Sequence, residues 1–354
     1  MVLCGFEEGW VNQHGNAWGE GIEIKGTPRF ALGDSVQIVD LMGSGTPGIL
    51  WSFERTGTQT RMYYLDLCRG VKPYVLNEMN NNMGAITRVE YTSSIRHYLR
   101  DLYGTSVTED PQTNLPDTLD MFIGSAGKWK TTLPFPTQVV NRVEVIDEIS
   151  EGKLTTHYFY HHGYWDGGER EFRGFGRVDQ FDSEDFNHFN DTSLHLDANF
   201  EGVSQLHYSP PMLVKNWFHL GPVGAATGDW DQLFFENEYH QSDPQVLPPS
   251  PETLQLLANL PRRARRDALR TLRGTALRTE SYAVDGSNRQ FKPYTVSETR
   301  AGLKLEDHPG NNPTIKMLAT QRHSNHIFFS FTDGSRTTQW ERGNDPMVQF
   351  SFSG

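Results

Sequence analysis

Residues 137–149 read TQVVNRVEVIDEI and residues 155–162 read TTHYFYHH, and these two stretches decide the fold class. Both are rich in β-branched and aromatic residues, which favour the pleated surface of a β-sheet. The segment Ser150-Glu151-Gly152-Lys153 separates them and has the composition of a turn. The sequence therefore predicts an antiparallel hairpin over these residues.

The residues that precede this hairpin continue the strand pattern. Residues 10–18 (WVNQHGNAW) place two aromatic-flanked segments around a turn with a glycine, which is typical of a hairpin. Residues 36–41 (VQIVDL) and 49–51 (ILW) are apolar strands joined by a glycine-rich loop, the unit from which propeller blades are built. Further strands are expected at 61–67 and 85–91, and the polar residues 101–131 are interpreted as a long loop or insertion.

The C-terminal part adds two helices to the strands. His240–Pro251 contains four prolines in twelve residues, which predicts a linker at 241–251. Ser250 can cap a helix that begins at Pro251. Apolar residues then recur at helical spacing up to Leu272, with a break at Pro261. Strands are expected at 177–181, 212–220, 276–284, 290–298 and 326–331, so the predicted fold is mainly β with a short helical segment.

The composition is that of a folded, acidic protein. Hydrophobic residues make up 36% and aromatic residues 12% of 354 residues, enough for a sizeable core. The net charge of −12 argues against nucleic-acid binding, because phosphate contact needs a basic surface. We expect no membrane span and no signal peptide, since no apolar run has the required length. The only cysteines, Cys4 and Cys68, cannot form a four-cysteine zinc site and are interpreted as small buried hydrophobes.

Two segments contain residue types found in metal sites. The 36–51 loop resembles the calcium loops of propeller blades, but Asp40 is its one acidic residue, which favours a structural turn. His157, His161 and His162 are the densest histidine group, but in a strand His157 and His161 would alternate with His162 across the two faces. No carboxylate at ligand spacing completes a zinc site. The histidines are interpreted as polar residues of a pleated surface, and no metal or cofactor is predicted.

Residues 163–176, GYWDGGEREFRGFG, hold the candidate for catalysis. An aromatic-lined pair of carboxylates among Asp166, Glu169 and Glu171 is what a glycosidase needs for its acid and its nucleophile. Two arginines interleave these acids, however, and mixed charge beside glycines is more typical of a salt-bridged turn. No nucleophile elbow, phosphate-binding loop or dinucleotide motif occurs, and no catalytic residue is predicted.

Seven arginines gather between Arg262 and Arg278 against one acidic residue, Asp267. Such a cluster could bind nucleic acid or another anionic surface. In an acidic protein, a helix face that pairs with the protein's own carboxylates is the favoured interpretation.

Longer strings of sequence resemble one known family. The strings DLMGSGTPGILWS (40–52), YLDLCRGVKPY (64–74) and MGAITRVEY (83–91) are similar to the middle region of the B subunit of insecticidal toxin complexes, the SpvB/TcdB-like family. The similarity continues, in the same order, through LPFP (133–136), RVEVID (142–147), HHGYWDG (161–167), EREFRGFG (169–176), LRGTALRTE (272–280) and PYTV (293–296).

The resemblance implies a structural role. In that family the B subunit joins a β-propeller to a hollow shell of strand-rich RHS-type repeats, which a C subunit with a toxic tail closes, and the propeller docks on a pore-forming A subunit. Residues 1–75 would be a terminal propeller-blade region, 76–240 a β-rich shell segment and 252–354 a segment of helices followed by strands. The implied partners are an A-type pore-forming subunit and a C-type RHS subunit or the remainder of a B subunit, within a secreted complex that has no enzyme activity in this chain.

The chain also departs from the family. A complete B subunit is several times longer, so the chain is expected to be a fragment, a split gene product or a degenerate homologue. Strand edges left open in a partial propeller or shell would pair with other polypeptide. The alternative function is a carbohydrate-active or glycan-binding β protein that uses Trp165, Asp166, Glu169 and Glu171.

Overall fold

The computed structural model forms two compact units, Met1–Val75 and Leu76–Gly354, and each is described by itself. The residues that the structure describes are 2–3, 8–13, 15–28, 34–53, 61–104, 123, 126–149, 152–182, 210–224, 235–241, 246–306, 327–340 and 346–352. Cys4 and most of the stretch predicted as a loop at 101–131 lie outside these residues.

The first unit contains two small antiparallel sheets. One has the order β1 (Val2–Leu3), β2 (Glu8–Gln13) and β3 (Ala17–Glu23), and the other β4 (Ser35–Val39), β5 (Gly48–Phe53) and β6 (Arg61–Leu65). The strands predicted around residues 10–18 and 36–51 are thereby confirmed. Ile49, Trp51 and Phe53 alternate along β5, so they share one face and form the core of the second sheet.

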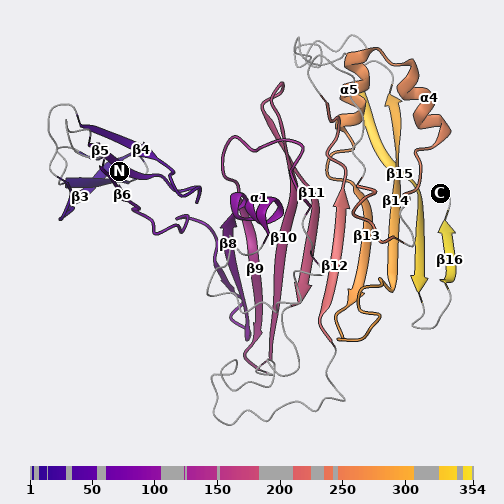
Figure 1. Cartoon of the computed structure of the whole chain (residues 1–354), viewed down its shortest axis with the longest axis horizontal. Helices are drawn as coiled ribbons and strands as arrows, with labels where there is room; N and C mark the ends of the chain where they lie inside the picture. The colour runs from indigo at the N-terminus through magenta and orange to yellow at the C-terminus, as the bar shows by residue number, and fades with distance from the viewer. Residues whose placement is uncertain are drawn as a thin grey trace. The chain divides into compact units, whose positions relative to one another are not determined.

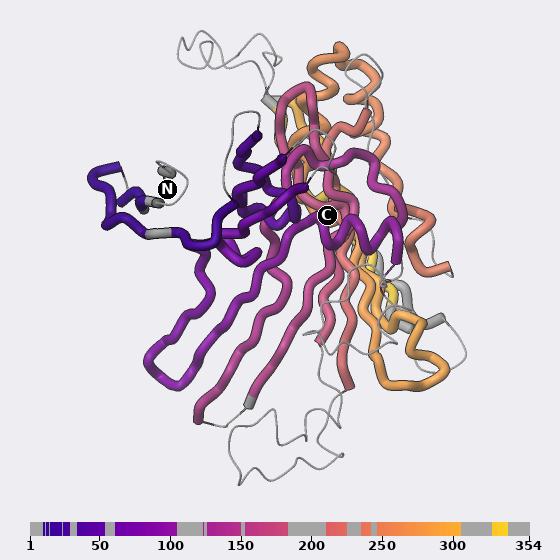
Figure 2. Tube along the Cα trace, turned by 60° about the vertical axis from the view of Figure 1, so that its left-hand side comes forward, coloured from indigo at the N-terminus to yellow at the C-terminus, as the bar shows by residue number. Residues whose placement is uncertain are grey.

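The second unit is built on a ten-stranded antiparallel sheet whose strands follow one another in chain order from β7 to β16 (Figure 1). The tube in Figure 2 shows several of these strands side by side in that order. Each connection therefore returns the chain to the neighbouring position, as in a meander. The strands are β7 (Glu78–Asn80), β8 (Ala85–Ser93), β9 (Gln138–Asp147), β10 (Gly152–Asp166), β11 (Glu171–Asp182), β12 (Met212–Phe218), β13 (Ala276–Ala283), β14 (Thr295–Glu306), β15 (Ile327–Trp340) and β16 (Pro346–Phe352).

The predicted hairpin is confirmed as β9 and β10, which pair antiparallel from Asp147 opposite Gly152. β10 and β11 are longer than predicted, because the glycine-rich segment at 163–176 is the end of a second hairpin rather than a separate irregular stretch. Two of its glycines lie within strands for steric reasons. A Cβ at Gly163 would collide with the Trp129 ring, and one at Gly176 with the Phe235 ring.

Helix α1 (Ser94–Tyr103) follows β8 directly and corrects the interpretation of residues 101–103 as loop. The Ser93 side chain caps the helix by accepting a hydrogen bond from the Ile95 N–H. Its buried positions include His97 and Asp101. Because this inward face is polar, the apolar periodicity that predicts most helices is missing here.

The two predicted C-terminal helices are confirmed as α4 (Pro251–Asn259) and α5 (Arg262–Arg270). The Ser250 hydroxyl caps α4 by accepting from the Thr253 N–H at 3.3 Å, and proline occupies the first turn as expected. The apolar sides of both helices pack with Leu303 of β14 and Phe328 of β15. Within the described part of the chain, no helix has the length and apolar character that a membrane span requires.

Candidate functional site: a buried belt of charged residues

A row of large side chains crosses six strands of the ten-stranded sheet. Directly opposed residues are His161 and Arg177, Arg177 and Trp217, Trp217 and Arg278, Arg278 and Glu298, and finally Glu298 and Arg336. Opposed residues of an antiparallel pair project from the same face of a sheet. A second row, two residues away from the first on β11, β12 and β13, contains Asp179, Lys215 and Glu280. We call the charged residues of both rows the belt: His161, Arg177, Asp179, Lys215, Arg278, Glu280, Glu298 and Arg336.

Arginine and carboxylate partners alternate along the belt. The Arg177 guanidinium donates two hydrogen bonds to the Asp179 carboxylate, from Nε at 2.8 Å and from Nη2 at 2.5 Å. Arg278 donates from Nε to Glu280 at 2.8 Å and from Nη1 to Glu298 at 2.6 Å. Arg336 completes the series, with Nε 2.7 Å from Glu298. Bidentate and charge-assisted bonds of this kind fix the planes of both groups.

Most of the belt is removed from solvent, and Lys215 and Arg336 are partly buried. Asp179 and Glu280 are 0% exposed, Arg278 is 1% exposed and Glu298 2% exposed. Burying an unpaired charge would strongly destabilise the folded protein, and the pairing of opposite charges offsets this cost. Although burial opposes it, the Arg177 charge holds the pKa of Asp179 far below its ordinary value. Burial raises the pKa of Glu298 in spite of its two arginine neighbours.

Aromatic rings separate the arginines of the belt. The Arg177 guanidinium lies 5.5 Å from the centre of the Trp217 ring, and Arg278 lies 4.8 Å from that of Tyr239. Trp217 and Tyr239 themselves meet edge to face. These cation–π contacts stabilise cations that stand in one row of the same sheet.

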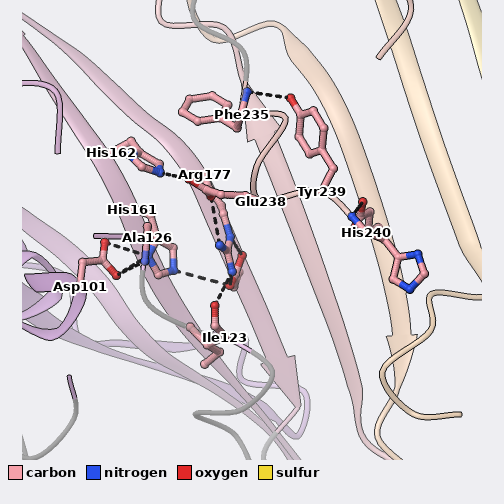
Figure 3. A network of polar contacts seen from close by, with 12 residues as sticks. Asp101, Ile123, Ala126, His161, His162, Arg177, Phe235, Glu238, Tyr239 and His240 are labelled. Carbon is pink, nitrogen blue, oxygen red and sulfur yellow. Dashed lines mark hydrogen bonds and ion pairs between the residues drawn. The ribbon is translucent and has the colours of Figure 1, made fainter. Parts of the chain in front are cut away.

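His161 connects the belt to helix α1, as Figure 3 shows. Its Nδ1 lies 2.8 and 2.9 Å from the two carboxylate oxygens of Asp101, which is on α1. Its Nε2 lies 3.5 Å from Asp179 Oδ2, an ion-pair distance that is too long for a strong hydrogen bond. Burial and the Arg177 charge oppose protonation, but the two aspartates outweigh them and raise the pKa of His161. A ring between two carboxylates is best satisfied as imidazolium, which donates from both nitrogens.

The segment 235–241 lies over the belt and is held by polar contacts (Figure 3). Glu238 accepts a bond from Arg177 Nη1 at 3.1 Å and a very short one from His162. The backbone N–H of His240 donates to Glu280 at 3.0 Å. Together with Asp101 and Glu238, the belt then has five cations (His161, Arg177, Lys215, Arg278 and Arg336) and five anions (Asp101, Asp179, Glu238, Glu280 and Glu298), so it is neutral when all are ionised.

The three histidines are placed differently from the prediction. They lie on a strand as expected, but all three are buried, with 6%, 1% and 9% exposure for His157, His161 and His162. Carboxylates that are distant in sequence reach two of them. His162 has a φ of 57°, which departs from the extended conformation. It therefore reaches the Arg177–Glu238 cluster although a regular strand would place it on the face opposite His161.

The acidic residues of segment 163–176 form the salt-bridged turn that was favoured over a catalytic pair. Asp166 pairs with Arg173 and with Arg266 of α5. Glu169 also forms an ion pair with Arg266. Glu171 receives Arg270 at 3.0 Å and Arg273 at 2.5 Å. Although burial opposes it, the Glu169 N–H and the two arginines lower the pKa of Asp166, which therefore stays ionised. We call Asp166, Glu169 and Glu171 the acidic turn.

The arginine cluster accordingly pairs with carboxylates of the same protein, as its charge balance predicted. The Asp40 loop is also closed by its own backbone, since the two Asp40 oxygens accept from the N–H groups of Ser44 and Gly45 at 2.9 and 2.7 Å. No group of three or more metal-ligating side chains is found within the described ranges. The site thus consists of ion pairs that join strands, helices and covering segments.

The belt was not predicted from the sequence, although two short stretches of sequence indicate part of it. The tripeptides RVD at 177–179 and RTE at 278–280 place an arginine and a carboxylate on the same face of a strand. Two such tripeptides in predicted strands indicate a charged stripe. They do not show that β12 lies between the two strands, or that the stripe is buried.

Comparisons with known proteins agree with this architecture. The profile described as insecticide toxin TcdB middle/N-terminal region matches residues 24–199, and that described as insecticide toxin TcdB middle/C-terminal region matches residues 267–352. A crystal structure of TcdB2-TccC3 without its hypervariable C-terminal region is similar at 26% identity and a TM-score of 0.62, over 95% of this chain and 14% of that chain. A Photorhabdus luminescens Tc holotoxin pore with a mutated TccC3 is similar at 26% identity and a TM-score of 0.63, over 94% of this chain and 13% of that chain. Comparison with curated proteins gives no match.

A sequential β meander held together by paired buried charges defines a structural β protein, in which the ionisable groups serve architecture. More specifically, the chain belongs to the insecticidal toxin TcdB family and corresponds to its middle region. It spans about 14% of the length of the TcdB2-TccC3 chain without the hypervariable C-terminal region.

Proposed function

We propose that this chain is a wall segment of a Tc-type toxin B component, which forms part of the propeller and of the hollow shell that encloses and delivers a toxic C-subunit cargo through an A-type pore. The observation that carries the proposal is the strict chain order of the ten-stranded sheet. A meander of this kind grows by adding one strand at an edge, so it can continue into a wall of any length.

The two units receive separate parts in this proposal. Residues 1–75 are assigned to the terminal propeller-blade region, 76–240 to the first shell segment, 241–251 to a linker and 252–354 to the second shell segment. The strand–glycine loop–strand unit of β4 and β5 supports the first assignment. The matches of residues 24–199 and 267–352 to the two halves of the TcdB middle region support the two shell assignments.

The proposed partners are an A-type pore-forming subunit and a C-type RHS subunit or the remainder of a B component. Support comes from the related structures, one of which is TcdB2-TccC3 and another a Tc holotoxin pore. By the same analogy the chain acts outside the producing cell, as part of a secreted complex and without enzyme activity of its own.

The glycosidase alternative is not supported. A glycosidase needs one carboxylic acid able to protonate the leaving group and a second carboxylate available to the sugar. In the acidic turn, Asp166, Glu169 and Glu171 each pair with at least one arginine. These ion pairs occupy the carboxylates that a sugar would need, and the lowered pKa of Asp166 keeps that residue ionised, a form that cannot act as a general acid.

A chimera tests the proposal. The matching region of a TcdB2-type B component is replaced by residues 76–354, and the chimera is assembled with a C-type subunit. Limited proteolysis should leave the enclosed cargo as resistant as in the parent complex. The parent with a deletion of the same region serves as the control in which cargo is exposed.

Two results would contradict the proposal. One is a chimera that folds and binds the C-type subunit but leaves its cargo open to protease. The other is glycoside hydrolysis by the intact chain that disappears in Glu169→Gln and Glu171→Gln, because these substitutions affect only stability or assembly in a wall segment.

A further inference from the structure

A histidine ring of the sheet lies between two buried carboxylates, one of which belongs to α1. Helix α1 also contacts the sheet through the His97 Nδ1, which accepts from the Tyr160 N–H, and through the Ser94 hydroxyl, which accepts from the Thr137 N–H. His161 is 1% exposed and Asp101 is 1% exposed, while Asp179 is fully buried. Asp101 belongs to α1, His161 to β10 and Asp179 to β11. One ring therefore touches carboxylates from two other elements.

Asp101 also accepts hydrogen bonds from residues 126–129, which lie after α1 in the chain. Its Oδ2 accepts a 2.7 Å bond from the Trp129 ring N–H, and its Oδ1 a longer one from the Ala126 N–H. Trp129 in turn packs edge to face on Phe175 of β11. Helix α1 and residues 126–129 thus form one covering layer whose polar centre is the Asp101–His161 pair.

We propose that His161 is a pH-dependent fastener: as imidazolium it holds α1 and residues 126–129 on the sheet, and its deprotonation at alkaline pH loosens this layer. A neutral ring has one N–H and one lone pair. With Nδ1–H directed at Asp101, the lone pair of Nε2 faces the Asp179 carboxylate at 3.5 Å. The deprotonated cluster thereby gains a negative charge in a buried site, which weakens the docked state.

The direction of the effect follows from linkage. The pKa of His161 is raised in the folded protein, so its contribution to docking is complete below its ordinary value and is lost as pH rises through the folded value. Mild acid does not have this effect, because the pKa values of Asp179 and Glu238 are lowered and both stay ionised. The fastener therefore tolerates acid and responds to base.

Other charged and titratable groups also face the cluster. They are His97, Arg100 and Asp101 on α1, Arg177 and Asp179 on β11, Lys215 on β12, and His162 and Glu238 beyond Arg177. Burial lowers the pKa of His97 to about 3, so it stays neutral throughout. Burial lowers the pKa of Lys215 to about 8, and the loss of its buried charge favours the folded state at high pH, opposite to His161. A local measurement on α1 therefore separates the two.

The experiment is hydrogen exchange of the full chain between pH 6.5 and 9.5, with protection factors corrected for intrinsic exchange. We expect the protection of α1 amides to fall by about tenfold or more over this range, whereas that of α4 changes little. His161→Gln, which cannot titrate, should abolish the change. His157→Gln is the matched control, because His157 is buried on the same strand with a pKa lowered by burial to about 4, and it should respond like the parent.

Loss of α1 protection that is equal in His161→Gln and the parent overturns the proposal, as does α1 protection that stays constant with pH in the parent. Should the variant fail to fold, NMR titration of the His161 ring in the parent decides. A ring that titrates above its ordinary value supports the fastener, and one that titrates at or below that value refutes it.

Discussion

Arg278→Met is the sharpest test of the belt. Arg278 is 1% exposed and is the central cation between Glu280 and Glu298. Methionine has a similar length and no charge, so the substitution removes the cation while leaving most of the packing in place.

The expected loss of stability depends on the bonds that Glu280 and Glu298 keep when Arg278 is replaced. Removing one partner of a buried ion pair costs about 3–5 kcal/mol, because it leaves an uncompensated charge. Glu280 keeps bonds from Tyr282 Oη at 2.5 Å and from the His240 N–H, and Glu298 keeps Arg336. We therefore expect the lower end, about 3 kcal/mol. The deficit should shrink as pH falls, because protonation neutralises carboxylates whose pKa rises when the arginine is lost.

Urea unfolding followed by far-UV circular dichroism measures the change at pH 8 and pH 5. Arg88→Met is the matched control on the same sheet, since the side chains of Arg88 and Glu78 are about half exposed, at 52% and 49%. Breaking that surface pair should cost about 0–1 kcal/mol. Adding Glu280→Gln to Arg278→Met should restore part of the stability. Equal costs for Arg278→Met and Arg88→Met would refute the reasoning.

Two further predictions concern other parts of the chain. Arg266→Met removes the α5 cation that joins two carboxylates of the acidic turn, and should destabilise the second unit by about 1–3 kcal/mol, between the surface and buried cases. Exchange protection of α5 should fall with it; unchanged stability together with unchanged protection of α5 would contradict a stabilising role for Arg266. Gly48→Ala places a Cβ against the Leu65 carbonyl across β5 and β6, which should cost about 1–3 kcal/mol. The loss should appear as reduced exchange protection in β4, β5 and β6 and leave the second unit unchanged, and normal protection in these three strands would disprove the steric argument.

Local patterns in the chain were sufficient for the fold class and for several elements. The alternation at 137–149 and 155–162 predicted β9 and β10, and Ser250 with Pro251 predicted the start of α4, because these signals lie within a few neighbouring residues. The interleaved arginines also predicted that the acidic turn is salt-bridged, and Arg173 is one of its partners. The other described partners, Arg266, Arg270 and Arg273, lie about a hundred residues away along the chain and could not be assigned from the local pattern. Helix α1 could not be predicted, since its buried side is polar.

The belt depended on information that no local pattern contains. Asp101 and its belt partner His161 are 60 residues apart, and the belt residues Glu298 and Arg336 are 38 residues apart. Whether such groups meet depends on strand order and register, and a shift of one residue would turn every belt side chain to the opposite face. Alternation along the chain specifies that a strand has two faces. The folded sheet specifies which charges share a face and are buried, because that follows from long-range pairing.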